Sequence, residues 1–176
     1  DHAYAMKNIM QRVADAMVEE GTPFTGVLYG GLMKTPNGIK VIEFNARFGD
    51  PETEVVLPRL KSDAVDVFGA VANNEQPVAE WSDEATLGIV LASKGYPGNY
   101  EKGHVIRGTE HVDAKLYHMG TAMKDGELVT AGGRVMFVVA SASTLREAQL
   151  KAREEISKIE CDNLFHRTDI GNKAFK

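Results

Sequence analysis

The chain has 176 residues, of which 43% are hydrophobic and 26% charged, a composition typical of one folded domain or two small ones. Its net charge of -5 comes without a block of like charges, so the sequence lacks the basic footprint of a nucleic-acid-binding protein. No apolar run approaches the roughly 18 residues of a membrane span. The single cysteine, Cys161, excludes an internal disulfide and suits a reducing compartment. Taken together, the charge, the short apolar runs and the single cysteine predict a cytoplasmic protein that binds neither nucleic acid nor membrane.

The first twenty residues have the pattern of a helix. Apolar side chains recur at helical spacing from Met6 to Met17, and Gly21 is placed to end the helix. The chain opens with Asp1 rather than methionine and runs directly into this pattern. We therefore expect the true N-terminus of the protein to lie upstream.

A hairpin and two helices are predicted next. FTGVLYGGLMK (24–34) and IKVIEFNAR (39–47) have the composition of strands, and TPNG (35–38) between them has that of a turn. In GDPETE, which follows, we expect Asp50 to cap a helix with Pro51 in its first turn. Pro58 should break or bend that helix, and a second helix is expected over roughly residues 63–73.

The polar, unpatterned segment NNEQPVAEWSDE (73–84) indicates a domain boundary, which we place between residues 78 and 79. Beyond it, strands are predicted in TLGIVLASK, HVIRG, KLYHMGTAMK and GRVMFVVASA, with a hairpin turn at KDGE. Thr144 and Glu147 form a capping box that opens a last helix. The predicted fold class is α+β, with an antiparallel sheet and helices in 1–78 and a small β-rich domain closed by a helix in 79–176.

The returning strand of the first hairpin carries the candidate site. Strict alternation places on one face Val41, Glu43, Asn45 and Arg47, and on the opposite face, assigned to the core, Ile42, Phe44 and Ala46. Glu43 and Asn45 offer the hard oxygen ligands that Mg²⁺ or Mn²⁺ accepts. Arg47 could hold a carboxylate or phosphate through two hydrogen bonds. The alternative is an exposed antiparallel face whose charges simply meet water.

Four segments carry a resemblance to a known family: GVLYGGLM (26–33), KVIEFNARFGDPETEVVLPRLKSD (40–63), ASKGYPGNYEKG (92–103) and TAGGRVMFVVA (130–140). They resemble, in order, the phosphoribosylamine–glycine ligases, also called glycinamide ribonucleotide synthetases, which are ATP-grasp enzymes of purine biosynthesis. RFGDPE is the most specific of these matches. The resemblance implies that 1–78 is the C-terminal part of an ATP-grasp domain and 79–176 the C-terminal domain of the ligase.

The resemblance also implies roles for four residues. Glu43 and Asn45 match the two protein ligands of the Mg²⁺ or Mn²⁺ that bridges the phosphates of ATP, the co-substrate. Arg47 and Asp50 match charged positions at the substrate end of that site. The implied reaction joins glycine to 5-phosphoribosylamine through glycyl phosphate.

Two departures from the family pattern limit what this chain is expected to do. GVLYGGLM lacks the further carboxylate that many ATP-grasp enzymes supply from this strand, so two protein ligands are assigned. The family's substrate domain and ATP lid are absent from these residues, and no Gly-rich phosphate loop is present. We expect the missing N-terminal half of the same enzyme to be a partner, and the chain alone to be inactive.

Two alternative functions remain, namely another carboxylate–amine ATP-grasp ligase of nucleotide biosynthesis and a non-catalytic binding or assembly module.

Several conspicuous residues are assigned minor roles. His104, His111 and His118 are spaced by seven, but that spacing on strands and loops does not bring three side chains together, and we interpret them as surface or packing residues. Cys161 has no activating neighbour in sequence and is interpreted as inert. Residues 132–134 and 95–97 are interpreted as a turn and a strand exit, with a role at a ligand cleft as the alternative.

Overall fold

The computed structural model describes residues 1–175, which form two compact units. The first unit comprises Asp1–Thr53 and Leu60–Trp81, and the second comprises Glu54–Arg59 and the chain from Ser82 onward. The domain boundary at residue 78 and the identities of the two domains stay predictions. Within residues 1–175, no helix combines the length and the apolar character needed to cross a membrane.

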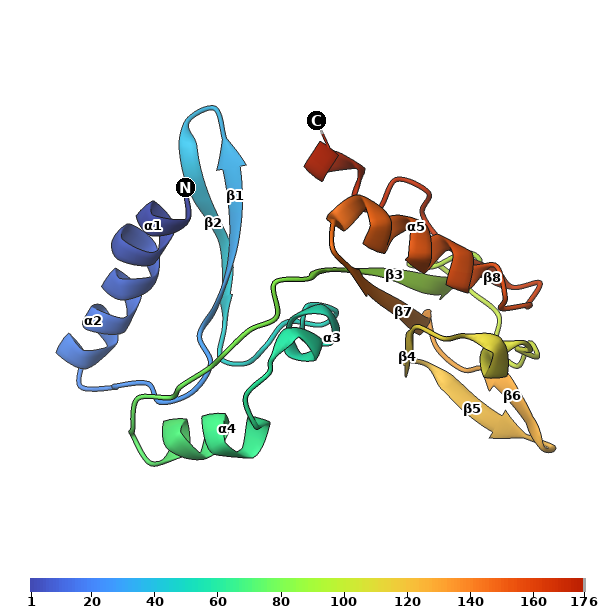
Figure 1. Ribbon diagram of the computed structural model, residues 1–176, viewed down its shortest axis with the longest axis horizontal. Coiled ribbons are helices and arrows are strands. Elements are labelled where there is room, and N and C mark those ends of the chain that lie inside the picture. Colours follow the sequence, from blue (N-terminus) through green and yellow to red (C-terminus); the bar gives the residue numbers. More distant parts are fainter. Residues whose placement is uncertain (176) are drawn as a thin grey trace. The chain divides into compact units, whose positions relative to one another are not determined.

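The first unit begins with the predicted helix. It runs without interruption through α1 (His2–Ala5), a π-helical turn η1 (Met6–Met10) and α2 (Gln11–Glu19), and it lies beside a two-stranded hairpin (Figure 1). Gly21, with φ of +74°, adopts the left-handed conformation that ends many helices. Both the helix and its end are therefore confirmed.

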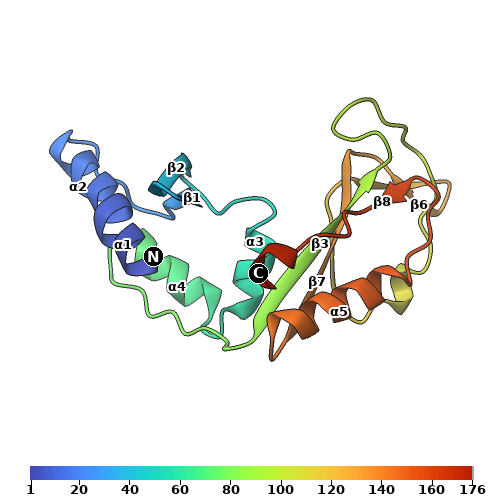
Figure 2. The same ribbon diagram turned by 90° about the horizontal axis from the view of Figure 1, so that it is seen from above.

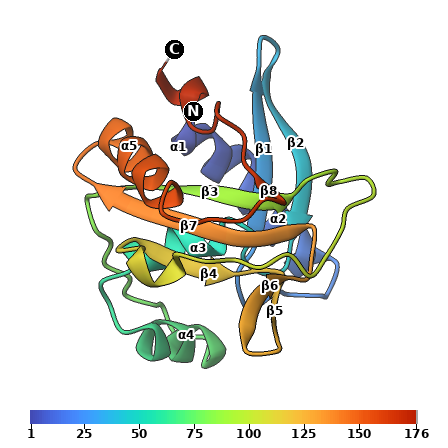
Figure 3. The ribbon, with the colours of Figure 1, turned by 90° about the vertical axis from the view of Figure 1, so that its right-hand side faces the viewer.

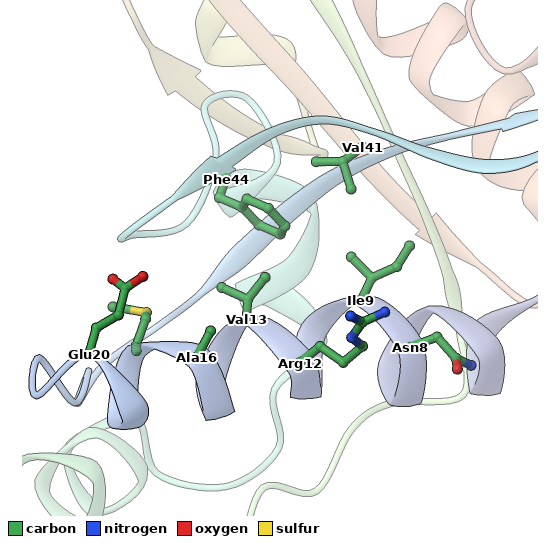
Figure 4. Close-up of a pocket in the computed structure, with 9 residues that line it drawn as sticks. Asn8, Ile9, Arg12, Val13, Ala16, Glu20, Val41 and Phe44 are labelled. Atoms are coloured by element: carbon green, nitrogen blue, oxygen red, sulfur yellow. The ribbon is translucent and has the colours of Figure 1, made fainter.

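The hairpin consists of β1 (Tyr29–Thr35) and β2 (Gly38–Asn45), paired antiparallel as predicted. The register shifts between Gly31, whose partner is Glu43, and Leu32, whose partner is Val41. This irregularity breaks the strict alternation along β2. As a result, Val41 lines a groove together with Phe44 on the side of α2, and its predicted place on the face of Glu43 is wrong (Figure 4).

The prediction that the apolar side of β2 belongs to the core is also wrong. Ile42 is 62% exposed and Phe44 is 39% exposed. The physical reason is the size of the sheet, because two strands covered by one helix cannot enclose a row of apolar side chains. The side that carries Val41 and Phe44 is a partly open apolar groove, and Ile42 does not line it.

The segment after β2 differs from the prediction at its start. The expected helix cap at Asp50 is wrong, because residues 50–52 form a turn and α3 begins at Thr53 and ends at Val56. The backbone N–H of Thr53 donates to the carbonyl of Gly49 at 3.0 Å, which closes that turn. The chain then tightens into the 3₁₀ helix η2 (Leu57–Arg59) around Pro58, as expected of a proline at that position. Helix α4 (Ala64–Ala72) follows, with Asp63 as its N-cap, in agreement with the prediction.

The second unit is built on a four-stranded antiparallel sheet, seen in Figure 3. Its order is β4-β7-β3-β8, formed by β3 (Ala85–Ser93), β4 (Lys115–His118), β7 (Arg134–Ala142) and β8 (Leu164–Phe165). Strands β5 (Thr121–Lys124) and β6 (Glu127–Thr130) make a separate hairpin, whose turn places Asp125 and Gly126 at positive φ. Short 3₁₀ turns η3 (Thr109–His111) and η4 (Asn172–Phe175) complete the unit.

The main core lies between this sheet and helix α5 (Leu145–Ile156), which runs along it in Figure 2. The Thr144–Glu147 capping box that opens α5 is present as predicted. Cross-strand pairs of β3 and β7 face the helix and pack on its small residues, which are Ala148 and Ala152. The core residues of the two strands on this side are Leu87, Ile89, Leu91, Met136, Val138 and Ala140.

Two strand predictions in this unit need correction. HVIRG is not a strand, because Val105 and Arg107 make only isolated bridges, to Val129 and Glu160. KLYHMGTAMK is two strands rather than one, since the chain leaves β4 at His118 and enters β5 at Thr121. At this break the N–H groups of Met119 and Gly120 both donate to the carbonyl of Val135, which ends the regular ladder.

Gly88 provides a test of packing on the other face of the sheet. A Cβ at Gly88 would collide with the ring of Phe137, a residue that is 3% exposed. We expect Gly88→Ala to lower the free energy of unfolding by about 1–3 kcal/mol, because the buried ring has little room to move. Urea denaturation measures this change. Gly69→Ala is the control, since a Cβ in α4 meets nothing within 4 Å and alanine favours a helix. Equal stability of the two variants would contradict the packing argument.

Candidate functional site

The candidate site lies on the face of the β1–β2 hairpin that points away from the helix. Tyr29 is directly opposite Asn45, and Gly31 is directly opposite Glu43. Directly opposed residues of an antiparallel pair share a face, so these four residues form one patch. The other face belongs to the helix, since a Cβ at Gly30 would lie 2.7 Å from the sulfur of Met10.

Glu43 and Asn45 are in direct contact. The Asn45 Nδ2 atom donates a hydrogen bond of 3.0 Å to Glu43 Oε1. Turning the amide by half a rotation would place Asn45 Oδ1 beside the same carboxylate, and both oxygens are donors that suit a small, hard cation. The pair therefore fits a divalent metal ion that takes its remaining ligands from water and phosphate.

The space next to this pair is kept open by glycine. A Cβ at Gly31 would lie 3.2 Å from Glu43 Cγ, so a side chain there would press on the carboxylate. Glu43 itself is exposed and Asn45 is half-buried. Glycine at position 31 thus leaves the Glu43 side chain unobstructed by its cross-strand neighbour.

Arg47 and Asp50 are not on the strand. Strand β2 ends at Asn45, so Arg47 lies beyond the strand. The prediction that Arg47 shares one strand face with Glu43 is therefore wrong. The Arg47 Nη1 atom instead donates to the carbonyl of Phe48 at 3.0 Å, and the side chain is exposed. Asp50 is exposed in the turn that precedes α3. Both residues follow the Glu43–Asn45 pair within a few positions, on a segment that folds back at Gly49.

The sequence analysis assigned no role at the site to Tyr29 and Gly31, which lie on this face, or to Glu52, which contacts Tyr29. The hydroxyl of Tyr29 donates to Glu52 Oε1 at 3.3 Å, and both side chains are half-buried. Burial raises the pKa of Tyr29, and the nearby carboxylates of Glu52 and Glu43 raise it further. Alternation along β1 would have placed Tyr29 and Gly31 on one face, but only the register of the hairpin shows that this is the face of Glu43.

The other candidates lie in the second unit and form no cluster. His104 pairs with Glu101 at 3.3 Å, whereas His118 Nδ1 lies 2.9 Å from the hydroxyl of Thr121. Among residues 1–175, no group of three or more His, Cys, Asp or Glu side chains has the arrangement of a metal site. Gly133 packs against Tyr96, since a Cβ there would lie 2.6 Å from a ring carbon of that tyrosine. This contact joins the 95–97 and 132–134 segments.

A carboxylate–amide pair on an antiparallel hairpin, followed by a separate β-rich unit, agrees with the ATP-grasp arrangement that the resemblance of the sequence implies. Comparison with known families agrees. Residues 1–53 match the phosphoribosylglycinamide synthetase ATP-grasp (A) domain, and residues 86–173 match the phosphoribosylglycinamide synthetase C domain. The chain belongs to the phosphoribosylglycinamide synthetase family.

Individual relatives are named phosphoribosylamine–glycine ligases. The phosphoribosylamine–glycine ligase of Halalkalibacterium halodurans is 55% identical over 172 residues, which are 97% of this chain and 40% of the relative. That of Agrobacterium fabrum is 46% identical over 175 residues, 96% of this chain and 41% of the relative. The crystal structure of the Thermotoga maritima phosphoribosylamine–glycine ligase is 34% identical, with a TM-score of 0.79 over 88% of this chain and 39% of that one. The chain thus spans about 40% of the length of its relatives.

Proposed function

We propose that this chain is the C-terminal portion of a phosphoribosylamine–glycine ligase of purine biosynthesis. The Glu43–Asn45 contact carries the proposal, because it places a carboxylate and an amide side chain next to each other on an exposed face in a chain of this family. In the proposed reaction, the carboxylate of glycine attacks the γ-phosphate of ATP, which forms glycyl phosphate and releases ADP. The amine of 5-phosphoribosylamine then attacks the glycyl carbonyl, and inorganic phosphate leaves.

In this proposal Glu43 and Asn45 hold the Mg²⁺ or Mn²⁺ ion that accompanies ATP. When bound, that ion neutralises charge on the phosphates during transfer. Arg47, an exposed cation beyond the end of β2, would bind the carboxylate or phosphate of a substrate. Asp50 in the adjoining turn is the group suited to the amine of a substrate. The proposed location is the cytoplasm, which the single cysteine suits.

The proposal requires a partner segment equivalent to the part of the relatives that this chain does not span. The open groove between α2 and β2 supports it, because Ile9, Val13 and Phe44 point into the groove from both sides (Figure 4). An apolar groove of this kind buries its side chains only when another segment packs into it. The further side chains that bind the carboxylate and phosphates of the substrates in a closed active site would come from that segment.

The proposal predicts that the 176-residue chain folds alone but does not ligate. Phosphoryl transfer depends on cationic donors around the phosphates in a site that excludes water, and Arg47 alone cannot supply such an enclosure. Phosphate release would be measured with ATP, Mg²⁺, glycine and 5-phosphoribosylamine, first for the chain alone and then with the remaining segment of the Halalkalibacterium halodurans ligase. We expect glycine-dependent release only in the second mixture. Release by the chain alone, well above that of Glu43→Gln, would contradict the proposal.

A further inference from the structure

The contacts around Gly49 assign a positioning role to Tyr29 and Glu52, a role that rests on the proposed function. We propose that this pair, which we call the tyrosine–glutamate clasp, holds the turn that carries Asp50 against the hairpin that carries Glu43 and Asn45. Neither residue would touch a substrate. The clasp would set the distance between the two parts of one site.

The first half of the clasp is built into the hairpin. Tyr29 starts β1 directly opposite Asn45, and its ring is half-buried on the face of the candidate site. Its hydroxyl donates to Glu52 Oε1 at 3.3 Å, across 23 positions of sequence. This hydrogen bond therefore ties the strand pair to the segment that follows it.

The second half holds Gly49. The carboxylate of Glu52 packs on the Cα of this glycine so closely that a Cβ there would lie 2.8 Å from Glu52 Cδ. The N–H and hydroxyl of Thr53 both donate to the Gly49 carbonyl, at 3.0 Å and 2.5 Å. Gly49 is buried in consequence, although its neighbour Asp50 is exposed. A turn held on both sides of Gly49 leaves Asp50 little freedom to move away from the hairpin.

The contacts of Glu52 fit a positioning role, because its carboxylate meets the strand at Tyr29 and the turn at Gly49. Glu43 Oε1 accepts from the Asn45 amide, whereas Glu52 Oε1 accepts from the Tyr29 hydroxyl and the Glu52 carboxylate packs close to Gly49. The carboxylates of Glu52 and Glu43 both act on Tyr29, and its hydroxyl donates to Glu52. Removing its hydroxyl would free Glu52 without changing either of the proposed ligands.

The first test measures amide hydrogen exchange and does not depend on catalytic activity. Tyr29→Phe removes only the hydroxyl, and amide hydrogen exchange of residues 49–53 in the 176-residue chain should then accelerate roughly 5-fold, the effect of one lost hydrogen bond. Tyr4→Phe, at an exposed tyrosine of α1, is the matched control and should leave exchange unchanged. Unchanged exchange at 49–53 in Tyr29→Phe would overturn the clasp, whatever the chain catalyses.

The second test uses the enzyme completed with the Halalkalibacterium halodurans segment. Tyr29→Phe and Glu52→Ala should each lower kcat roughly 10- to 100-fold, as loss of supporting hydrogen bonds does around other sites, while the Kd of Mg·ATP from calorimetry stays within about 2-fold. Glu52→Gln keeps an acceptor for the hydroxyl and should retain most of the activity. The double variant should be no worse than either single one, because both break the same contact.

The outcomes separate the two proposals. A completed wild-type enzyme without glycine-dependent phosphate release would contradict the proposed function, and the exchange result would still decide the clasp. An active wild type with additive losses in the double variant, or with equal losses in kcat and in Mg·ATP affinity, would overturn the clasp alone.

Discussion

Glu43→Gln is expected to lower glycine-dependent phosphate release at least about 100-fold in the enzyme completed with the Halalkalibacterium halodurans segment. This loss exceeds the one expected when a residue that only supports a metal ligand is removed. Glutamine keeps the shape of the side chain and its contact with Asn45, but it removes the negative charge that draws a divalent ion to this exposed face. Steady-state rates over a range of Mg²⁺ concentrations measure the effect. Partial recovery at high Mg²⁺ would be expected, because weaker metal binding is the cause.

Glu19→Gln is the control for this prediction, because Glu19 is an exposed carboxylate at the end of α2 in the same unit. It should leave the rate unchanged. Circular dichroism should show an unchanged fold for both variants. Normal activity of Glu43→Gln at limiting Mg²⁺ would remove Glu43 from the metal site.

Glu155→Ala is expected to cause the largest loss of stability, about 2–4 kcal/mol in the free energy of unfolding. Glu155 is 5% exposed on α5, and its Oε2 atom accepts the N–H groups of Asp113 at 2.7 Å and Ala114 at 3.4 Å. Lys158 Nζ lies 2.9 Å from Glu155 Oε1 and 3.1 Å from Asp113 Oδ2. Alanine would leave two backbone donors without their acceptor and a void beneath the helix.

The same carboxylate makes stability depend on pH. Burial alone would raise the pKa of Glu155, but the hydrogen bonds from Lys158 and from the N–H groups of Asp113 and Ala114 outweigh it, and the pKa lies below its usual range. A lowered pKa means that Glu155 stabilises the fold above the unfolded-state value of about 4.3, and that this contribution is lost as pH falls through the lower folded-state value. The stability difference between wild type and Glu155→Ala should therefore shrink below about pH 4.

Urea denaturation at pH 7 and at pH 3 measures both effects. Glu154→Ala is the matched control, since the neighbouring carboxylate is exposed on the same helix. Glu155→Gln should fall between wild type and Glu155→Ala, because its amide oxygen can still accept from Asp113. Equal losses for Glu154→Ala and Glu155→Ala at pH 7 would contradict the buried network.

Local chemistry determined most of the secondary structure. Gly21, Asp63 and the Thr144–Glu147 pair end or begin their helices as predicted, because caps satisfy backbone groups through neighbours in sequence. The turns of both hairpins were predicted for the same reason. HVIRG failed as a strand because pairing depends on partners far along the chain, and the composition of five residues does not specify them.

Some features of the candidate site could likewise be predicted from local sequence, whereas others depended on the tertiary structure. Glu43 and Asn45 could be paired from sequence, since residues two apart on a strand share a face and this rule needs no other part of the chain. The tertiary structure alone decided that Tyr29 and Gly31 join them, because cross-strand register is a long-range property. It also decided that Val41 turns to the helix side, since a shift in register reverses the faces beyond it. The family resemblance could be established from the sequence, whereas the contact between Tyr29 and Glu52 required the chain to fold back at Gly49.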